Sequence, residues 1–290
     1  MSTSVSIIVP CFNQAHFLNE LLYNIDAAVS SPYELIIIDD GSTDGVMDKV
    51  AKSLTPVSKN QSLTVIRQAN KGLSGTRNVG LKKSKGQFIQ FLDSDDLLVP
   101  SKIDTQIALL EQHGCDICID DYMLCDEKKS NLNNPPSNTI GDYELCFEDI
   151  AQYWEREMSI PIHCALFRKQ VIEEVQFDEE LAGKEDWVFW LNVFAKDPSC
   201  IHHKEVGAIY RQHANSMTKD SSLKMGIMWL LAVSKNARNH PDRFTAEFIN
   251  GALKHFQSYY SRKFWLLHGP QFPERLYNSA LSNFKTNPTP

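Results

Sequence analysis

The stretch F-I-Q-F-L-D-S-D-D runs from Phe88 to Asp96, and in it an apolar segment ends abruptly in three carboxylates within four residues. A short apolar run with aromatic and β-branched residues is typical of a strand buried on both faces of a parallel sheet. Three carboxylates at its end repel one another unless a cation lies among them. Mg²⁺ and Mn²⁺ take oxygen ligands and also bind substrate phosphates. The stretch therefore predicts a metal-assisted ligand site at a strand end, with a solvated acidic turn as the alternative.

Working outward from this stretch, apolar runs alternate with segments of helical periodicity. The apolar runs cover 5–9, 35–38, 63–66 and 88–92, and the helical segments cover about 16–29, 74–83 and 101–111. This alternation predicts a Rossmann-like, mostly parallel central sheet flanked by helices. We expect Ser101 to cap the helix that it precedes. From Leu223 onward the pattern is helical, so we expect one α/β domain over 1–220 and a C-terminal helical extension over 221–290.

Composition excludes several classes of protein. The formal net charge is -7, which argues against a general nucleic-acid-binding surface. There is no apolar run of the roughly 18 residues that a transmembrane helix needs, and the first strand begins without a preceding signal peptide. The seven cysteines form an odd, irregularly spaced set, and the Cys115-x-x-Cys118 pair suits a strand with buried thiols better than a zinc site. We therefore expect a cytoplasmic protein with free thiols.

Polar motifs recur at the ends of the predicted strands and again later in the chain. In this order and spacing they resemble the inverting family 2 nucleotide-sugar glycosyltransferases of the GT-A fold, over about residues 4–220. Each motif alone is weak evidence, but six in order make chance a poor explanation. The motifs are Val9–Asn13, Asp39–Asp44, Asn70–Asn78, Asp93–Asp96, Lys184–Trp187 and Tyr210–His213, with Ser216 and Thr218 behind the last.

The resemblance implies a set of nucleotide-binding residues. In this chain they are Pro10, Phe12, Asn13, Asp40, Asn70, Arg77, Asp93, Arg211 and Ser216. Asp40 would accept a hydrogen bond from the N–H of a uracil ring. The alternative is that Asp40 is a turn residue, because the sequence D-G-S-T-D has good turn chemistry. Both can hold, since Asp39 and Asp40 are adjacent and one of them can serve each role.

The resemblance also implies a metal site formed by Asp95 and His213, for Mn²⁺ or Mg²⁺. The ion would bridge the two phosphates of a nucleoside diphosphate and offset the charge that grows on the leaving group. Asp96 either caps the next helix or orients Asp95.

An inverting transfer needs a base that removes the proton from the acceptor hydroxyl. Asp186 matches the family's base, Glu185 is the alternative, and the competing interpretation of Asp186 is a plain helix N-cap. Trp187 and Trp190 follow at helical spacing, and they either stack on a sugar or belong to the core.

These implications predict a metal-dependent transferase that uses a nucleoside-diphosphate sugar, with UDP the expected nucleotide. The acceptor would be a hydroxyl of a glycan or a lipid-linked glycan in surface polysaccharide biosynthesis. A non-catalytic nucleotide-binding protein of the same fold, or another nucleotide-dependent transferase, is the alternative.

The apolar residues from Phe244 to Phe264 recur at helical spacing beside basic residues. They suit packing on the catalytic domain or a homodimer contact better than a peripheral membrane contact.

Overall fold

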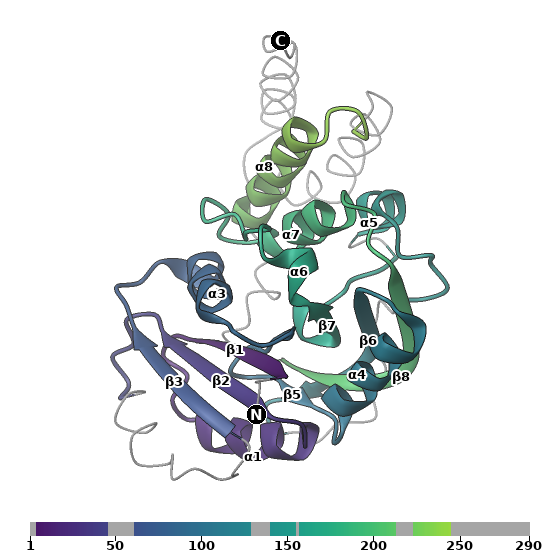
Figure 1. The fold of residues 1–290 in the computed structure, drawn as a ribbon. Coiled ribbons are helices and arrows are strands. Elements are labelled where there is room, and N and C mark those ends of the chain that lie inside the picture. Colours follow the sequence, from purple (N-terminus) through teal and green to yellow (C-terminus); the bar gives the residue numbers. More distant parts are fainter. Residues whose placement is uncertain (1–3, 46–60, 129–139, 155–156, 213–222, 245–290) are drawn as a thin grey trace.

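The computed structural model describes residues 4–45, 61–128, 140–154, 157–212 and 223–244, which form a mixed α/β sheet flanked by helices (Figure 1). The strands are β1 (Val5–Cys11), β2 (Tyr33–Asp39), β3 (Gln61–Arg67), β4 (Phe88–Phe91), β5 (Leu97–Leu98), β6 (Ile117–Asp126), β7 (Ala165–Arg168) and β8 (Cys200–Gln212). The helices are α1 (Leu18–Ala28), α3 (Gly72–Lys83), α4 (Lys102–His113), α5 (Phe147–Tyr153), α6 (Lys169–Ile172), α7 (Glu185–Phe194) and α8 (Leu223–Asn239), with a 3₁₀ turn η1 (Ile162–Cys164).

The sheet has two halves of different topology. Its strand order is β3-β2-β1-β4-β7-β6-β8-β5. Strands β3, β2, β1 and β4 are parallel, as the alternation of strands and helices predicts. In the second half, β7 is antiparallel to both β4 and β6, while β8 is parallel to β6. The carboxyl ends of β1, β2 and β4 therefore meet at one edge, where α/β sheets bind their ligands.

Two apolar cores lie on opposite faces of this sheet. Alternate residues of β1 divide between them, since Ile8 belongs to one core and Ile7 and Val9 to the other. Helices α1 and α4 cover the face with Ile7 and Val9, whereas α3, α5, α6 and α7 cover the face with Ile8 (Figure 1). Burial on both faces explains why β1, β2 and β4 are largely apolar runs in the sequence.

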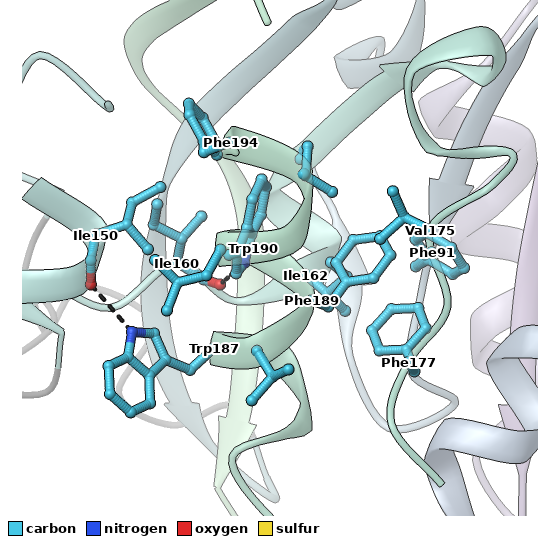
Figure 2. Close-up of a cluster of buried hydrophobic side chains, with 14 of the residues drawn as sticks. Phe91, Ile150, Ile160, Ile162, Val175, Phe177, Trp187, Phe189, Trp190 and Phe194 are labelled. Carbon is cyan, nitrogen blue, oxygen red and sulfur yellow. Dashed lines mark hydrogen bonds between the residues drawn. The ribbon is translucent and has the colours of Figure 1, made fainter. Parts of the chain in front are cut away.

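The aromatic side of α7 lies in the larger core. Trp187 and Trp190 are 1% and 0% exposed, and their indole N–H groups donate to the backbone oxygens of Ile150 and Ile160 (Figure 2). Phe189 stacks on Phe177 with ring centroids 4.0 Å apart. Sugar stacking by either tryptophan is therefore ruled out, and the core alternative holds.

Helix α8 packs against α7 (Figure 1). Trp229 stacks on Trp187 with ring centroids 6.0 Å apart, and Ala232 and Val233 are buried in the same core. Beyond α8, Phe244 is buried against Phe147. This start of the C-terminal extension thus packs on the catalytic domain, while the boundary at 220/221 stays a prediction.

The predicted cap at Ser101 is not confirmed, whereas the predicted free thiols are. Ser101 precedes α4, but its backbone is left-handed (φ 61°) and its side chain makes no capping hydrogen bond, so its predicted capping role is wrong. All seven cysteines lie in the described residues and are free thiols, as their spacing predicts.

None of the helices in the described ranges is both long enough and apolar enough to cross a membrane.

Candidate functional site

A pocket of about 970 Å³ opens at the carboxyl ends of β1, β2 and β4. This volume is typical of a small-molecule site. The structure brings together at this pocket eight of the residues that the sequence singles out. They are Pro10, Phe12, Asn13, Asp40, Asn70, Asp93, Asp95 and Glu185.

The loops that follow β1 and β2 are fastened to each other. The backbone N–H of Asn13 donates to Oγ of Ser42 at 2.9 Å, and Oδ1 of Asn13 accepts from the backbone N–H of Thr43 at 2.9 Å. Asn13 has a φ of 55°, a left-handed conformation that asparagine tolerates better than most residues. The turn leaves Phe12 49% exposed beside the pocket, where a flat aromatic ring can stack on a base.

Asp39 and Asp40 have different environments at the end of β2, and the contact of Asp40 with a base stays a prediction. Oδ1 of Asp39 accepts from the backbone N–H of Ser42 at 2.8 Å, so this carboxylate closes the turn. Asp40 lines the pocket and accepts from the backbone N–H groups of Lys71 and Gly72 at 2.8 and 2.9 Å. Asp40 thereby lies at the N-terminus of α3, where the helix dipole stabilises a carboxylate.

The three carboxylates after β4 have three different environments. Both oxygens of Asp93 accept from Nη2 of Arg77 at 2.8 Å. Asp96 is buried, and its Oδ2 lies 3.0 Å from Nδ1 of His163. Burial raises the pKa of Asp96 to about 6, and His163 opposes that shift. Asp95 is half-buried, lines the pocket and accepts from Nε2 of Gln14 at 3.1 Å.

Asp96 links the end of β4 to strand β8 in the second half of the sheet. Its Oδ1 accepts from the backbone N–H of Arg211 in β8 at 2.8 Å. The capping role considered for Asp96 is therefore not what the structure shows, because this side chain joins β4 to β8 instead. His163, which the sequence analysis did not single out, stacks on Tyr210 with ring centroids 5.8 Å apart, and Tyr210 lines the pocket.

The donor atoms at this edge fit a hard divalent cation. Within the described residues, no three histidine, cysteine, aspartate or glutamate side chains gather closely enough to hold a metal ion by themselves. Mg²⁺ and Mn²⁺ sites, however, use one or two carboxylates, water and the phosphates of the substrate. Asp95 supplies such a carboxylate at the pocket, and His213, the other predicted ligand, lies outside the described residues together with Ser216.

Two arginines predicted to contact the nucleotide are directed elsewhere. Arg77 is 2% exposed, and its Nη1 lies 3.3 Å from Oε1 of Glu185 in addition to its contact with Asp93. Arg211 is buried, donates to Oε2 of Glu20 at 2.9 Å and lies over the ring of Phe17. Both guanidinium groups therefore bind carboxylates of the protein, and their contact with a nucleotide stays a prediction.

The two candidate bases lie in the first turn of α7. Lys184 precedes the helix, so Asp186 is not its N-cap. Asp186 is half-buried and accepts from the backbone N–H of Trp187 at 2.8 Å. Glu185 is 5% exposed and lines the pocket. Burial and the neighbouring Asp186 raise the pKa of Glu185 to about 7, against the opposing effect of Arg77.

Several pocket residues have no motif that would have revealed them. Gln14, Glu127, Glu179 and Glu180 belong to no recognised pattern. All four line the pocket. Glu179 and Glu180 reach it from the loop before α7, which is far from the nucleotide motifs in sequence. Their placement depends on tertiary packing, so no sequence signal points to them.

Comparison with known proteins gives the family. The sequence matches the model described as glycosyl transferase family 2 over residues 6–176, more than half of the chain. The Escherichia coli protein named UDP-Glc:alpha-D-GlcNAc-diphosphoundecaprenol beta-1,3-glucosyltransferase WfaP is 27% identical over 270 residues, which is 89% of this chain and 98% of that protein. An uncharacterized glycosyltransferase of Rickettsia felis is 27% identical over 67% of this chain, which spans 31% of that relative's length.

Solved structures agree on the fold. S. aureus TarS 1–349 in complex with UDP-GlcNAc has a TM-score of 0.72 at 20% identity, over 97% of this chain and 80% of that one. The mannosyltransferase PcManGT from Pyrobaculum calidifontis, in complex with GDP-Man and Mn²⁺, has a TM-score of 0.63 at 16% identity, over 100% of this chain and 77% of that one. The chain therefore belongs to glycosyl transferase family 2, has the GT-A fold and is a glycosyltransferase.

Proposed function

We propose that this glycosyltransferase is metal-dependent and inverting, and that it moves a sugar from a UDP-linked donor to a hydroxyl of a lipid-linked glycan. The observation that carries the proposal is the pocket at the ends of β1, β2 and β4, where Asp40, Asp95 and Glu185 line one cavity. Such a cavity has room for a nucleotide at the strand ends and for a sugar toward α7. An α-linked donor would then give a β-linked product.

The charge of the pocket supports a requirement for a cation. Its lining includes eight carboxylates, and Lys71 supplies the one fixed positive charge among the lining residues that the structure describes. A diphosphate is repelled by such a surface unless a cation lies between them. Asp95 would hold Mn²⁺ or Mg²⁺ there, with His213 as the second predicted ligand. When bound, the ion would stabilise the negative charge of the leaving nucleoside diphosphate.

The relatives support the donor and acceptor classes. WfaP aligns over nearly its whole length, and its name describes transfer from UDP-Glc to a GlcNAc-diphosphoundecaprenol acceptor. The TarS neighbour binds UDP-GlcNAc, and the Pyrobaculum neighbour binds GDP-Man together with Mn²⁺. We propose the same reaction class for this chain, in surface polysaccharide biosynthesis on the cytoplasmic side of a membrane.

Asp186 is the proposed base. It matches the family motif and lies half-buried at the start of α7. Glu185 is the alternative, because it lines the pocket and its pKa of about 7 suits a proton acceptor. In the first assignment, Glu185 orients the first turn of α7 through its contact with Arg77.

The test is isothermal calorimetry of UDP, GDP and CDP, each with and without Mn²⁺, followed by a transfer assay. The assay would offer UDP-glucose and UDP-GlcNAc to a synthetic GlcNAc-diphospho-lipid, with each metal and with EDTA. We expect metal-dependent binding of UDP and transfer to the lipid. Binding of a nucleotide without any transfer or donor hydrolysis would favour a non-catalytic nucleotide-binding protein instead.

A further inference from the structure

The loop that enters α7, residues 178–184, is here called the α7 entry loop. Its residues Glu179, Glu180, Leu181 and Ala182 line the pocket, and Glu185 follows directly. The loop therefore forms the wall of the pocket that leads to Glu185, the one of the two candidate bases that lines the pocket. Since the proposed function places the donor sugar between β4 and α7, the position of this loop sets the space available to that sugar.

Helix α3 holds one end of the loop. The side-chain amide of Asn78 donates to the backbone oxygen of Phe177 at 2.9 Å and accepts from the backbone N–H of Phe177 at 2.8 Å. The same amide donates to Oε1 of Glu179 at 3.1 Å. These contacts fix the residues where the loop begins.

Lys235 of α8 also holds the first residues of the loop. Its Nζ donates to Oδ2 of Asp178 at 2.5 Å and to Oε2 of Glu180 at 2.8 Å. Lys235 is 14% exposed, and α8 is itself fixed on α7 by the Trp229–Trp187 stack. Burial lowers the pKa of Lys235, but the hydrogen bonds to Asp178 and Glu180 outweigh this effect and raise it. Lys235 therefore stays charged and joins two carboxylates of the loop.

A second ion pair between the same parts of the protein serves as a matched comparison. Arg243, just beyond α8, donates to both carboxylate oxygens of Asp197 at 2.8 and 3.0 Å. Asp197 follows the C-terminal end of α7, away from the pocket. Lys235 and Arg243 thus fasten the C-terminal segment at opposite ends of α7, and of the two it is Lys235 that contacts a residue of the pocket wall.

We propose that Lys235 is a positioning residue, through which the C-terminal helix α8 sets the geometry of the α7 entry loop for the bound donor sugar. This inference rests on the proposed function for its kinetic consequence. Partly exposed ion pairs contribute little to stability. Displacement of a positioning element by about 1 Å, in contrast, can lower a rate by up to about 10²-fold.

The test compares Lys235→Met, Lys235→Arg and Arg243→Met in the full chain. For Lys235→Met we expect kcat for UDP-sugar turnover to fall about tenfold. The Kd for UDP with Mn²⁺ should stay unchanged, because the partners of Lys235, Asp178 and Glu180, are not among the predicted nucleotide-binding residues. Lys235→Arg should recover most of the rate, and Arg243→Met should leave kcat unaltered. Lys235→Met and Asp178→Asn should be non-additive, because the two residues are in contact.

Backbone hydrogen exchange tests the same inference without turnover. Residues 178–184 should exchange faster in Lys235→Met than in the wild type, and their exchange in Arg243→Met should not change. Equal exchange in both variants, equal kcat in both variants, or a loss of UDP affinity in Lys235→Met would each overturn the role of Lys235. Absence of turnover in the wild-type protein would instead contradict the proposed function, and the exchange result would still decide on Lys235.

Discussion

The proposed nucleotide side of the pocket and its proposed base side are built by different kinds of contact. On the nucleotide side, the loops after β1 and β2 and the start of α3 are joined by hydrogen bonds between backbone N–H groups and side chains 29 to 32 residues away. On the base side, charged side chains meet across larger separations, 108 residues for Arg77 and Glu185 and 57 for Lys235 and Asp178. The first side is therefore fixed by short motifs, and the second depends on charge pairs that only the folded chain assembles.

The largest effect is expected for Asp186→Asn, which should slow the chemical step without weakening nucleotide binding. Asp186→Asn removes the proposed base but keeps the size of the side chain, so kcat should fall by about 10²–10⁴-fold. The Kd for UDP with Mn²⁺ should be unaffected, because the base acts only in the chemical step. Calorimetry and a transfer assay on the same preparation measure both quantities.

Phe12→Ala is the matched change on the nucleotide side. Removal of this exposed ring should weaken UDP binding about fivefold, which corresponds to loss of a stacking contact of about 1 kcal/mol, while kcat should not change.

The choice between the two candidate bases depends on their variants. Full turnover in Asp186→Asn together with an inactive Glu185→Gln would transfer the base assignment to Glu185.

Arg77 should dominate the stability of the base side. It is almost fully buried between Asp93 and Glu185, so Arg77→Met leaves two carboxylates without this partner. Removal of one member of a buried ion pair costs about 3–5 kcal/mol. We expect a loss of that size in the free energy of unfolding, measured by urea denaturation. Arg77→Lys should recover part of it.

Arg67 provides the contrasting arginine on the nucleotide side. Its side chain is 60% exposed and lies 3.6 Å from Asp39. Such a pair contributes about 0–1 kcal/mol, so Arg67→Met should leave stability nearly unchanged. Comparable losses for the two arginines would show that the contrast between the two sides is wrong.

The same contrast explains what the sequence could and could not predict. The central strands β1, β2 and β4 and the residues at their ends were predictable, because burial on both faces produces apolar runs and the chain turns where they stop. The entry loop residues Glu179 and Glu180 were not predictable, since an acidic pair in a loop looks the same whether it faces solvent or a pocket. The ion pairs of Arg77 and Arg211 were not predictable either, because a motif does not show which distant carboxylates will meet its arginine in the folded chain.

The pH dependence of the free energy of unfolding tests the protonation state of Glu185 on the base side. Burial raises the pKa of Glu185 from 4.5 to about 7, so the folded protein holds this proton while the unfolded chain has released it. Stability then falls as the pH rises from about 4.5 to 7, because the folded state binds more protons in that window. Each unit of pKa shift corresponds to about 1.4 kcal/mol, and we expect Glu185 to account for a decrease of about 1–3 kcal/mol.

Glu185→Gln should remove this part of the pH dependence and keep the rest. Asp96 changes stability in the same direction, since its pKa is raised from 3.8 to about 6, so a smaller decrease at the acidic end of the window should remain in the variant. Urea denaturation at half-unit pH steps in EDTA measures the difference between the two proteins without a bound metal. Because groups elsewhere titrate alike in both proteins, that difference isolates Glu185. If it stayed constant from pH 4.5 to 7, the proton would be absent from Glu185 in the folded state, and Arg77 would hold this residue as a carboxylate throughout.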